Sequence, residues 1–239
     1  MDAGYPRPEG APVLFLLPEF SLRPSEVGKF AEIVRKSAEN TVFVSGAGHL
    51  TRGEALSIES GAEKVWEPGS EHPYTNCALI GFGGSKVLRL QLKIVPSWEE
   101  RDRQAPGRVV RYFVGHQFQF IVVICSELLN RPQERTTIES VIAQLDDQGK
   151  RLNLVVWIQH NPDPRSDAFG QSILRLERPP YCPTVLVVST RNTRSSRLTN
   201  FAVSGAIVPS RRLINARISF RYNSSDWLIG SVEEAADAG

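Results

Sequence analysis

Three residues that could do chemistry together lie at the ends of three expected buried strands. Glu19 follows the apolar run 13–18, Lys93 lies within the run 90–96, and Cys125 ends the run 120–124. Folds of α/β type gather their functional groups at strand ends. Since burying an unpaired carboxylate or ammonium is costly, Glu19 and Lys93 are either solvated at a strand tip or paired with each other. Cys125 is the thiol that could serve as a nucleophile beside them.

Each of these residues also has an ordinary structural interpretation. Cys125 could be a packed thiol, Glu19 could cap the helix that follows it, and Lys93 could be a solvated charge. We expect Cys77 and Cys182 to be structural, because three cysteines without a Cys-x-x-Cys spacing favour neither a disulfide framework nor a thiolate metal site. The four histidines show no metal-ligand spacing. We therefore expect no metal and no cofactor.

The elements that must position these residues alternate between strands and helices. Apolar and β-branched runs predict strands at 13–17, 41–45, 77–82, 86–95, 107–113, 118–125, 152–158, 185–189 and 202–208. Helical spacing predicts a helix from an N-cap at Ser25 to about Ala38, and a second helix over 137–145. We expect Pro18 to close the first strand, a turn at 46–48, a hairpin at 83–84, and a loop or short helical excursion over 51–70. The pattern indicates an α/β fold with mixed sheets.

Composition and length are those of one ordinary globular domain. The chain has 239 residues, 41% of them hydrophobic, and no apolar run approaches the roughly 18 residues of a membrane-spanning helix. Its first residues lack the order of a secretory signal, which favours a cytoplasmic location. We expect an N-terminal tail over 1–12, one domain over 13–231, and a disordered acidic tail over 232–239.

The three strand-end segments, taken in order, resemble the carbon–nitrogen hydrolase family, also called the nitrilase superfamily. Its members carry an apolar strand that ends in Pro-Glu, a Lys followed shortly by Pro and Glu, and an Ile-Cys-x-Glu/Asp segment. The matching segments here are Leu17-Pro18-Glu19, Lys93-Ile94-Val95-Pro96-Ser97-Trp98-Glu99-Glu100 and Ile124-Cys125-Ser126-Glu127. The segments 154–162, 185–192 and 204–209 resemble the family's later strands and closing hairpin, so that the likeness covers roughly residues 13 to 210.

This resemblance implies a Glu-Lys-Cys triad that cleaves an amide or a nitrile. A thiol is a weak nucleophile until a base takes its proton, and the attack creates a negative charge that needs stabilisation. The resemblance assigns the nucleophile to Cys125, the base to Glu19, and the stabilising charge to Lys93 with the backbone N–H of Ser126.

Two further carboxylates are expected to support the triad. Similar enzymes orient the lysine with a second carboxylate, for which Glu99 is the better match by spacing and Glu100 the alternative. The resemblance also places Glu127 beside the nucleophile. Gln91 could compete with Lys93 for the aligned position, but a glutamine cannot supply the positive charge, and a protein with Gln91 in the site would be inactive.

The family fold implied by the resemblance is a four-layer αββα sandwich with mixed β-sheets. Its first strand and first helix come before the Pro-Glu strand, where this sequence has only twelve residues, so we expect that pair to be absent, replaced, or supplied by another segment or chain. Family members commonly pair their sandwiches, and an unpaired sheet edge invites a second chain, so we expect a homodimer.

The function implied is a hydrolase acting on a non-peptide amide or nitrile through a thioester on Cys125. Transfer of the acyl group to an amine is a neighbouring alternative. A different alternative is a catalytically silent module of the same fold, within a larger protein or binding an anionic partner. Seven arginines without any Asp, Glu or Lys between Arg191 and Arg221 motivate that alternative, although a solvated arginine-rich face is favoured over nucleic-acid binding.

Overall fold

The computed structural model describes residues 10, 12–66, 70–115, 118–128, 138–150, 152–160, 184–189, 205–207, 216–222 and 228–234. The first sheet holds, in this order, β1 (Val13–Leu22), β2 (Thr41–Thr51), β3 (Tyr74–Phe82) and β4 (Leu88–Leu92). The second sheet holds β5 (Tyr112–Gly115), β6 (Phe118–Ile124), β7 (Leu154–Gln159), β8 (Thr184–Ser189) and β9 (Gly205–Ile207). A separate antiparallel hairpin consists of β10 (Ala216–Tyr222) and β11 (Leu228–Glu234).

Both sheets are mixed, as the sequence predicts. In the first sheet β1 and β2 are parallel, whereas β2, β3 and β4 are mutually antiparallel neighbours. In the second sheet β6, β7 and β8 are parallel, and β5 and β9 pair antiparallel at its two edges. Since β6 and β7 run in the same direction, Cys125 and His160 lie just beyond the carboxyl ends of neighbouring strands.

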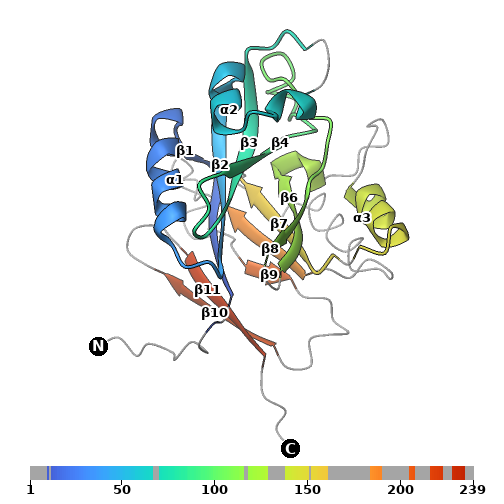
Figure 1. Cartoon of the computed structure of the whole chain (residues 1–239). Helices are drawn as coiled ribbons and strands as arrows, with labels where there is room; N and C mark the ends of the chain where they lie inside the picture. The colour runs from blue at the N-terminus through green and yellow to red at the C-terminus, as the bar shows by residue number, and fades with distance from the viewer. Residues whose placement is uncertain are drawn as a thin grey trace, which may run out of the picture.

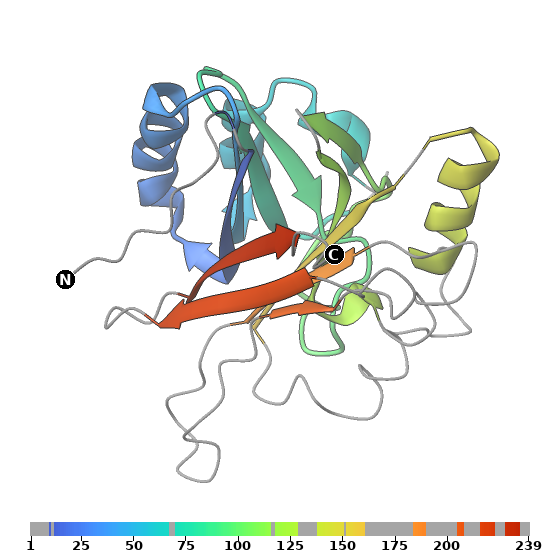
Figure 2. The same ribbon diagram turned by 90° about the horizontal axis from the view of Figure 1, so that it is seen from below.

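The helices cover the outer faces of the two sheets. α1 (Val27–Lys36) and α2 (Arg52–Ile58) lie against the first sheet, and α3 (Ile138–Asp147) lies against the second, with the sheets between them (Figures 1 and 2). Short 3-10 turns occur at Pro24–Glu26, Ala62–Val65 and Cys125–Leu128. The expected αββα sandwich is confirmed, and in the described residues no strand or helix precedes β1.

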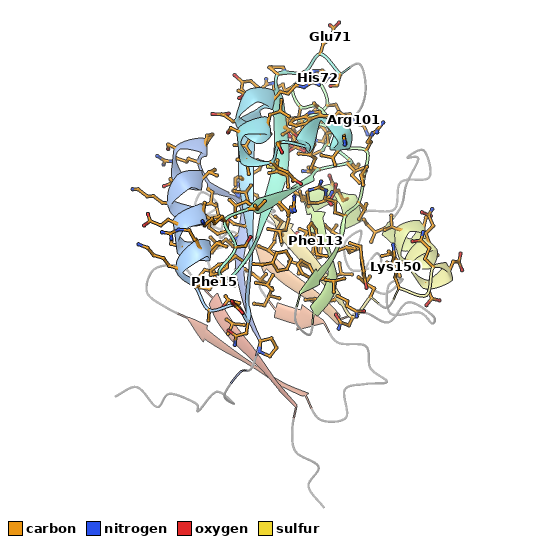
Figure 3. The ribbon with its side chains drawn as sticks, in the orientation of Figure 1. Phe15, Glu71, His72, Arg101, Phe113 and Lys150 are labelled. Atoms are coloured by element: carbon orange, nitrogen blue, oxygen red, sulfur yellow. The ribbon has the colours of Figure 1, made fainter. Side chains whose placement is uncertain are left out.

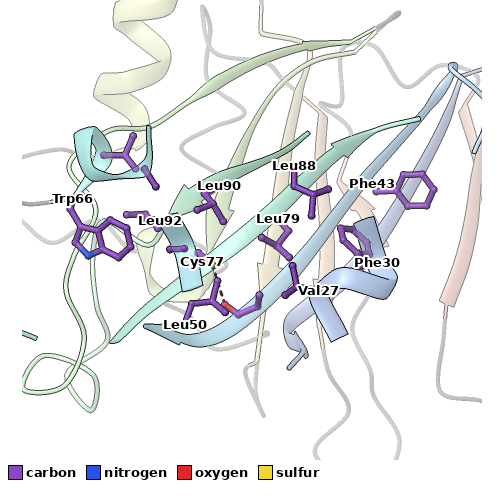
Figure 4. Packing of buried hydrophobic residues seen from close by; sticks show 14 of the residues in the cluster. Val27, Phe30, Phe43, Leu50, Trp66, Cys77, Leu79, Leu88, Leu90 and Leu92 are labelled. Carbon is purple, nitrogen blue, oxygen red and sulfur yellow. Dashed lines mark hydrogen bonds between the residues drawn. The ribbon is translucent and has the colours of Figure 1, made fainter. Parts of the chain in front are cut away.

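Three apolar clusters hold these layers together. The inner faces of the two sheets meet in a dry core that includes Val44 and Ile80 from the first sheet and Val122 and Val156 from the second. Phe113 of β5 stacks on Phe120 in this core and lies at the centre of the molecule in Figure 3. The outer core of the first sheet, drawn in Figure 4, packs under α1 and α2, and that of the second sheet packs under α3.

Cys77 belongs to the outer core of the first sheet. It is a free, fully buried thiol that contacts the Ala47 carbonyl at 3.4 Å (Figure 4), and burial raises its pKa well above the usual range. These properties fit the structural role expected for it.

Several expected boundaries were wrong, and the largest error concerns β2. The turn expected at Gly46 to Gly48 does not exist, because β2 continues to Thr51. A Cβ at position 48 would lie 2.0 Å from the ring of Phe20, so the glycine serves a close approach of β1 and not a turn. β1 also continues past Pro18 to Leu22, with a register shift against β2 between Leu17 and Leu22.

The first helix begins later than expected. α1 starts at Val27 after a 3-10 turn with Pro24 at its first position, and Ser25 lies inside that turn, so Ser25 is not the N-cap. Glu26 instead accepts a hydrogen bond from the Arg23 N–H at 2.9 Å. The region 51–70 contains the helical excursion that was expected, in the form of α2, which the side chain of Thr51 caps.

The end of the chain differs from expectation as well. The hairpin of β10 and β11 was not expected, and β11 reaches Glu234, so the tail does not begin at Val232. Most of the arginine-rich segment, Cys182, and residues 235–239 lie outside the described residues. None of the helices in the described ranges combines the length and the apolar character that crossing a membrane requires.

Candidate active site

Glu19 lies in the irregular part of β1 and is buried, with 1% of its side chain exposed. Its Oε1 accepts hydrogen bonds from Asn76 Nδ2 at 2.6 Å and from Lys93 Nζ at 3.0 Å, and its Oε2 accepts one from the His160 N–H at 2.8 Å. A Cβ on Gly46 would lie 2.4 Å from the Glu19 Cα, so the glycine allows this strand to approach β2. The carboxylate is therefore held on both oxygens and is not a solvated helix cap.

Lys93 follows β4 and is equally buried, with 2% of its side chain exposed. Its ammonium contacts two carboxylates, Glu100 Oε2 at 2.7 Å and Glu19 Oε1 at 3.0 Å. Burial alone lowers the pKa of an ammonium, but the neighbouring negative groups, Glu19 first, outweigh burial and raise the pKa of Lys93. The lysine is a fixed, fully protonated cation at the bottom of the site.

Gln91 does not compete for this position. Its amide nitrogen donates to the carbonyls of Leu92 and Val109 at 2.8 and 3.0 Å, and its oxygen accepts the Arg111 N–H at 2.7 Å. These bonds tie β4 to the segment before β5. The positive charge of the site comes from Lys93.

The second carboxylate is Glu100, not the expected Glu99. Glu100 accepts the Lys93 ammonium and, at 2.7 Å, the Ser97 N–H, whereas the side chain of Glu99 is exposed. The residues 97–100 form a turn, in which adjacent side chains point in different directions, so spacing along the sequence could not separate the two glutamates. Burial raises the pKa of Glu100, but the charge of Lys93 and three hydrogen bonds outweigh it and hold that pKa below its usual range.

Asn76 is a site residue that sequence reasoning missed. Its Nδ2 donates to Glu19 at 2.6 Å and to Glu100 Oε1 at 2.9 Å, so both amide hydrogens bind carboxylates and the orientation of the amide is fixed. The backbone carbonyl of Asn76 accepts a hydrogen bond from the backbone N–H of Lys93 at 2.8 Å. The available signal was a polar residue directly before an apolar strand, next to a Tyr-Thr pair that itself favours a strand.

Cys125 directly follows β6 and is the first residue of the 3-10 turn Cys125–Leu128. Its backbone has φ of +50°, a left-handed conformation that costs a non-glycine residue energy and persists where the surroundings enforce it. Trp157 Nε1 donates to the Cys125 carbonyl at 3.0 Å, and the Ser126 hydroxyl donates to the Val95 carbonyl at 3.1 Å. Both contacts hold the turn against neighbouring segments.

The thiol of Cys125 shares its surroundings with the buried charges. Burial first, and then the charge of Glu19 and a hydrogen bond from the thiol to it, raise the pKa of Cys125 to about 12, although the charge of Lys93 acts in the opposite direction. The resting state is therefore a neutral thiol beside a carboxylate that can accept its proton. Glu19, Lys93 and Cys125, expected from the three strand ends, lie together.

Glu127 connects the nucleophile turn to the lysine segment. It accepts the Ile124 N–H at 2.6 Å and also accepts the Ile94 N–H, next to Lys93. Burial raises its pKa to about 7, although these backbone N–H groups favour the ionised form. Glu127 thus lies close to Cys125 in the structure, and these contacts are with backbone groups.

This arrangement can activate a thiol, stabilise a developing negative charge with a fixed cation, and move a proton through Glu19. The described residues contain no group of three or more His, Cys, Asp or Glu side chains that could hold a metal ion. The chemistry that Glu19, Lys93 and Cys125 could do together is nucleophilic attack by a thiol.

Comparison with known proteins finds similar structures but no match by sequence. No family model and no curated protein matches the chain. Among solved structures it is similar to XC1258 from Xanthomonas campestris, a CN-hydrolase superfamily protein, with a TM-score of 0.55, 13% identity, and coverage of 95% of this chain and 78% of that one. Nit3 from Saccharomyces cerevisiae, of the nitrilase superfamily, gives a TM-score of 0.53, 14% identity, and coverage of 82% and 69%.

A longer protein shares the fold over part of its length. The glutamine-dependent NAD+ synthetase from Acinetobacter baumannii gives a TM-score of 0.52 at 15% identity, and the match covers 94% of this chain but only 38% of the synthetase. The four layers, the mixed sheets and these structural neighbours agree: the chain has the fold of the carbon–nitrogen hydrolase, or nitrilase, superfamily.

Proposed function

We propose that the protein is a carbon–nitrogen hydrolase that cleaves a non-peptide amide or a nitrile through a thioester on Cys125. The observation that carries the proposal is the Lys93 ammonium, buried between the carboxylates of Glu19 and Glu100 and next to the thiol. A charged cluster of this kind is costly to bury and adds no packing, which favours a catalytic reason for it. The fold shared with XC1258, which is named a CN-hydrolase superfamily protein, and with Nit3 of the nitrilase superfamily supports the same class.

Acylation of the cysteine would begin with proton transfer from Sγ to Glu19. The sulfur attacks the amide carbon, an S–C bond forms, and the carbonyl oxygen becomes negative. The Lys93 ammonium and the Ser126 N–H stabilise that oxygen. Glu19 then gives its proton to the nitrogen, the C–N bond breaks, and ammonia or an amine leaves the thioester behind.

Deacylation would use the same carboxylate. Glu19 takes a proton from water, the hydroxide adds to the thioester carbon, and the C–S bond breaks as Cys125 recovers its proton. The His160 N–H and Asn76 amide that hold the two oxygens of Glu19 keep it oriented through both steps. Acyl transfer differs only in that an amine replaces the water.

Glu100, Glu127 and Asn76 would act by positioning. Glu100 and Asn76 fix the ammonium and the base relative to each other, and Glu127 fixes the Cys125 turn relative to the segment after Lys93. Glu99, which is exposed, has no part in this proposal. The homodimer expected from the family resemblance stays a prediction.

Covalent trapping of the acyl-enzyme tests the proposal without knowledge of the substrate. The folded protein is mixed at neutral pH with a panel of activated esters, amides and nitriles, and the mass of intact protein and of the Cys125 peptide is measured. We expect an acyl adduct on Cys125, none in Cys125→Ala, and acylation about 100-fold slower in Lys93→Met, as when a donor to the developing oxyanion is removed. A folded protein that forms no adduct with any member of the panel would overturn the proposal and favour the silent binding module.

A further inference from the structure

Four side-chain rings form a chain of contacts across the two sheets beside the site. His49 of β2 stacks on Phe20 of β1 with ring centroids 5.3 Å apart and planes 9° apart. Tyr74 of β3 contacts His49 edge-on at 6.4 Å, and His160, after β7, contacts Phe20 edge-on at 5.8 Å. We call Phe20, His49, Tyr74 and His160 the aromatic belt.

The backbone under the belt is strained in order to present these rings. Among the described non-glycine residues, those with left-handed φ are Phe20 at +61°, His49 at +57° and the nucleophile Cys125 at +50°. A Cβ on Gly48 would lie 2.0 Å from the Phe20 ring, so the ring fits in this position only because residue 48 is a glycine. Such strain persists where it has a use, and here it produces the stacked pair.

The belt adjoins the carboxylate of Glu19 at one end and is exposed to solvent along its other side chains. Phe20 directly follows the buried Glu19, and the backbone N–H of His160 donates to Glu19 Oε2 at 2.8 Å. The side chains of His49, Tyr74 and His160 are exposed. A substrate that reaches Cys125 and Glu19 from this side therefore passes over the rings.

A buried amide beside the belt lacks one of its partners. Gln104 is 2% exposed, and its Nε2 lies 3.5 Å from His49 Nδ1, while its Oε1 has no hydrogen-bond partner among the described residues. If the side-chain amide were rotated by 180°, Oε1 would face His49 and Nε2 would be the atom without a partner. Since buried polar groups are nearly always satisfied, an unpaired amide end at this place indicates that a ligand supplies the missing hydrogen bond.

We propose that the aromatic belt binds the acyl part of the substrate and that this part is a planar aromatic or heteroaromatic group with a polar substituent that hydrogen-bonds to Gln104. The inference deepens the proposed function and rests on it, because the bound molecule is a substrate only if the protein catalyses the proposed reaction. Stacked and edge-on ring contacts favour a planar partner over a saturated one of the same size. The protein would then prefer aryl amides to alkyl amides.

Histidine NMR of the full chain with Cys125→Ala tests this inference, because the variant binds without turnover. The four imidazole C–H signals are followed during titration with benzamide and, separately, with cyclohexanecarboxamide, a saturated compound of similar size. We expect benzamide to shift the His49 and His160 signals at concentrations about tenfold lower than cyclohexanecarboxamide, a difference that stacking of one ring can supply. Equal titrations, or no shift with either compound, would overturn the inference.

Variants separate the belt from general effects. His49→Asn removes the ring and keeps a residue that tolerates left-handed backbone, and Phe20→Leu removes planarity with little change in size. Both should reduce the preference for benzamide to below about twofold. Phe15→Leu, at the other end of β1 (Figure 3), is the matched control and should keep the preference. Binding is measured in a protein that lacks the Cys125 thiol, so the result does not depend on formation of the acyl-enzyme. The binding experiment can therefore fail while the acyl-enzyme experiment succeeds, and the acyl-enzyme experiment can fail while the binding experiment succeeds.

Discussion

The Lys93 ammonium lies 2.7 Å from Glu100 Oε2, closer than the 3.0 Å that separates it from Glu19 Oε1. The cation is thus bound to two carboxylates at once, and Asn76 bridges the same two carboxylates from the other side. Four buried polar side chains therefore form one closed network, in which removing any member leaves the partners incompletely satisfied.

Two adjacent glutamates provide a matched test of that network. Glu100→Gln should lower kcat for any substrate found, or the acylation rate of Cys125, by about 100-fold, because the lysine loses a charged partner and shifts. Glu99→Gln should change either rate by less than about twofold, since its exposed charge is screened by water. Equal effects of the two substitutions would contradict the role assigned to Glu100.

The pKa of the Cys125 thiol depends first on burial and then on two charges that act in opposite directions. After burial, the carboxylate of Glu19 is the largest contributor to a thiol pKa of about 12, and Lys93 opposes it. Glu19→Gln should therefore lower the pKa of Cys125, and Lys93→Met should raise it. The measurement is the ultraviolet absorbance of the thiolate against pH, with Cys125→Ala subtracted so that the other two cysteines cancel. Shifts of the same sign in both variants would show that the charges do not act on the thiol as the geometry implies.

Glu127 is expected to affect the acylation rate of Cys125 by holding the backbone around it in position. Glu127→Gln puts an amide where two backbone N–H groups donate, so at least one of the Ile94 and Ile124 N–H groups loses its acceptor. We expect kcat or the acylation rate to fall at least tenfold while the pKa of the Cys125 thiol stays near its wild-type value. A rate unchanged within twofold would remove Glu127 from the set of positioning residues.

Gly46 should be nearly irreplaceable. A Cβ at position 46 would lie 2.4 Å from Glu19 Cα and 2.5 Å from the Pro18 carbonyl oxygen, both backbone atoms that cannot move separately. Gly46→Ala should destabilise the fold by about 1–3 kcal/mol in denaturant unfolding and displace Glu19. Gly53→Ala, in α2 with nothing within 4 Å of the added Cβ, is the control and should be neutral or stabilise by up to about 1 kcal/mol. Tolerance of alanine at both positions would argue against the close approach of β1 and β2.

Glu59 should make stability depend on pH away from the site. Burial raises its pKa, but Arg111 at 2.6 Å, the Leu90 N–H and Arg89 outweigh burial and lower it. A carboxylate whose folded pKa lies below its unfolded value contributes stability above the unfolded pKa, and this is lost as the pH falls through the folded pKa. Glu59→Gln should therefore cost about 2 kcal/mol at neutral pH, and the difference from wild type should narrow below about pH 4.

Thermal and denaturant unfolding at several pH values check the Glu59 prediction. Glu32→Gln is the control, because its pair with Lys36 is exposed, and it should change stability by less than about 0.5 kcal/mol at every pH. A Glu59→Gln penalty that stays constant down to acidic pH would show that hydrogen-bond geometry and not charge is responsible.

The sequence was informative where a charged residue ended an apolar run. Glu19, Lys93 and Cys125 could be found for that reason, because buried strands leave few places for charge. The αββα layers could be predicted because the family resemblance agreed with the alternation of apolar runs. The hairpin β10–β11 was not predicted, although Ala216–Tyr222 alternates apolar and polar residues with the period of a half-buried strand.

The remainder of the site depends on contacts between distant segments. Gly46 and Gly48 have the composition of a turn, but they are glycines because β1 passes too close for a side chain. Asn76 and Glu100 are distant in the sequence but form a hydrogen bond beside Lys93, and the residues adjacent to each of them in the sequence do not predict this contact. Which of two neighbouring glutamates faces inward was decided by a turn whose conformation the local sequence does not specify.

The nucleophile and its two charged partners belong to opposite halves of the sandwich. Glu19 and Lys93 come from the first sheet or the segment after it, Cys125 comes from the second, and the packed side chains of Val44, Ile80, Val122 and Val156 lie between the halves. The separation between Cys125 and its two charged partners therefore depends on how these side chains pack between the two sheets. Removing a methylene group from that interior is therefore expected to change the reactivity of Cys125 and the stability of the fold together, although the altered side chain lies away from the site.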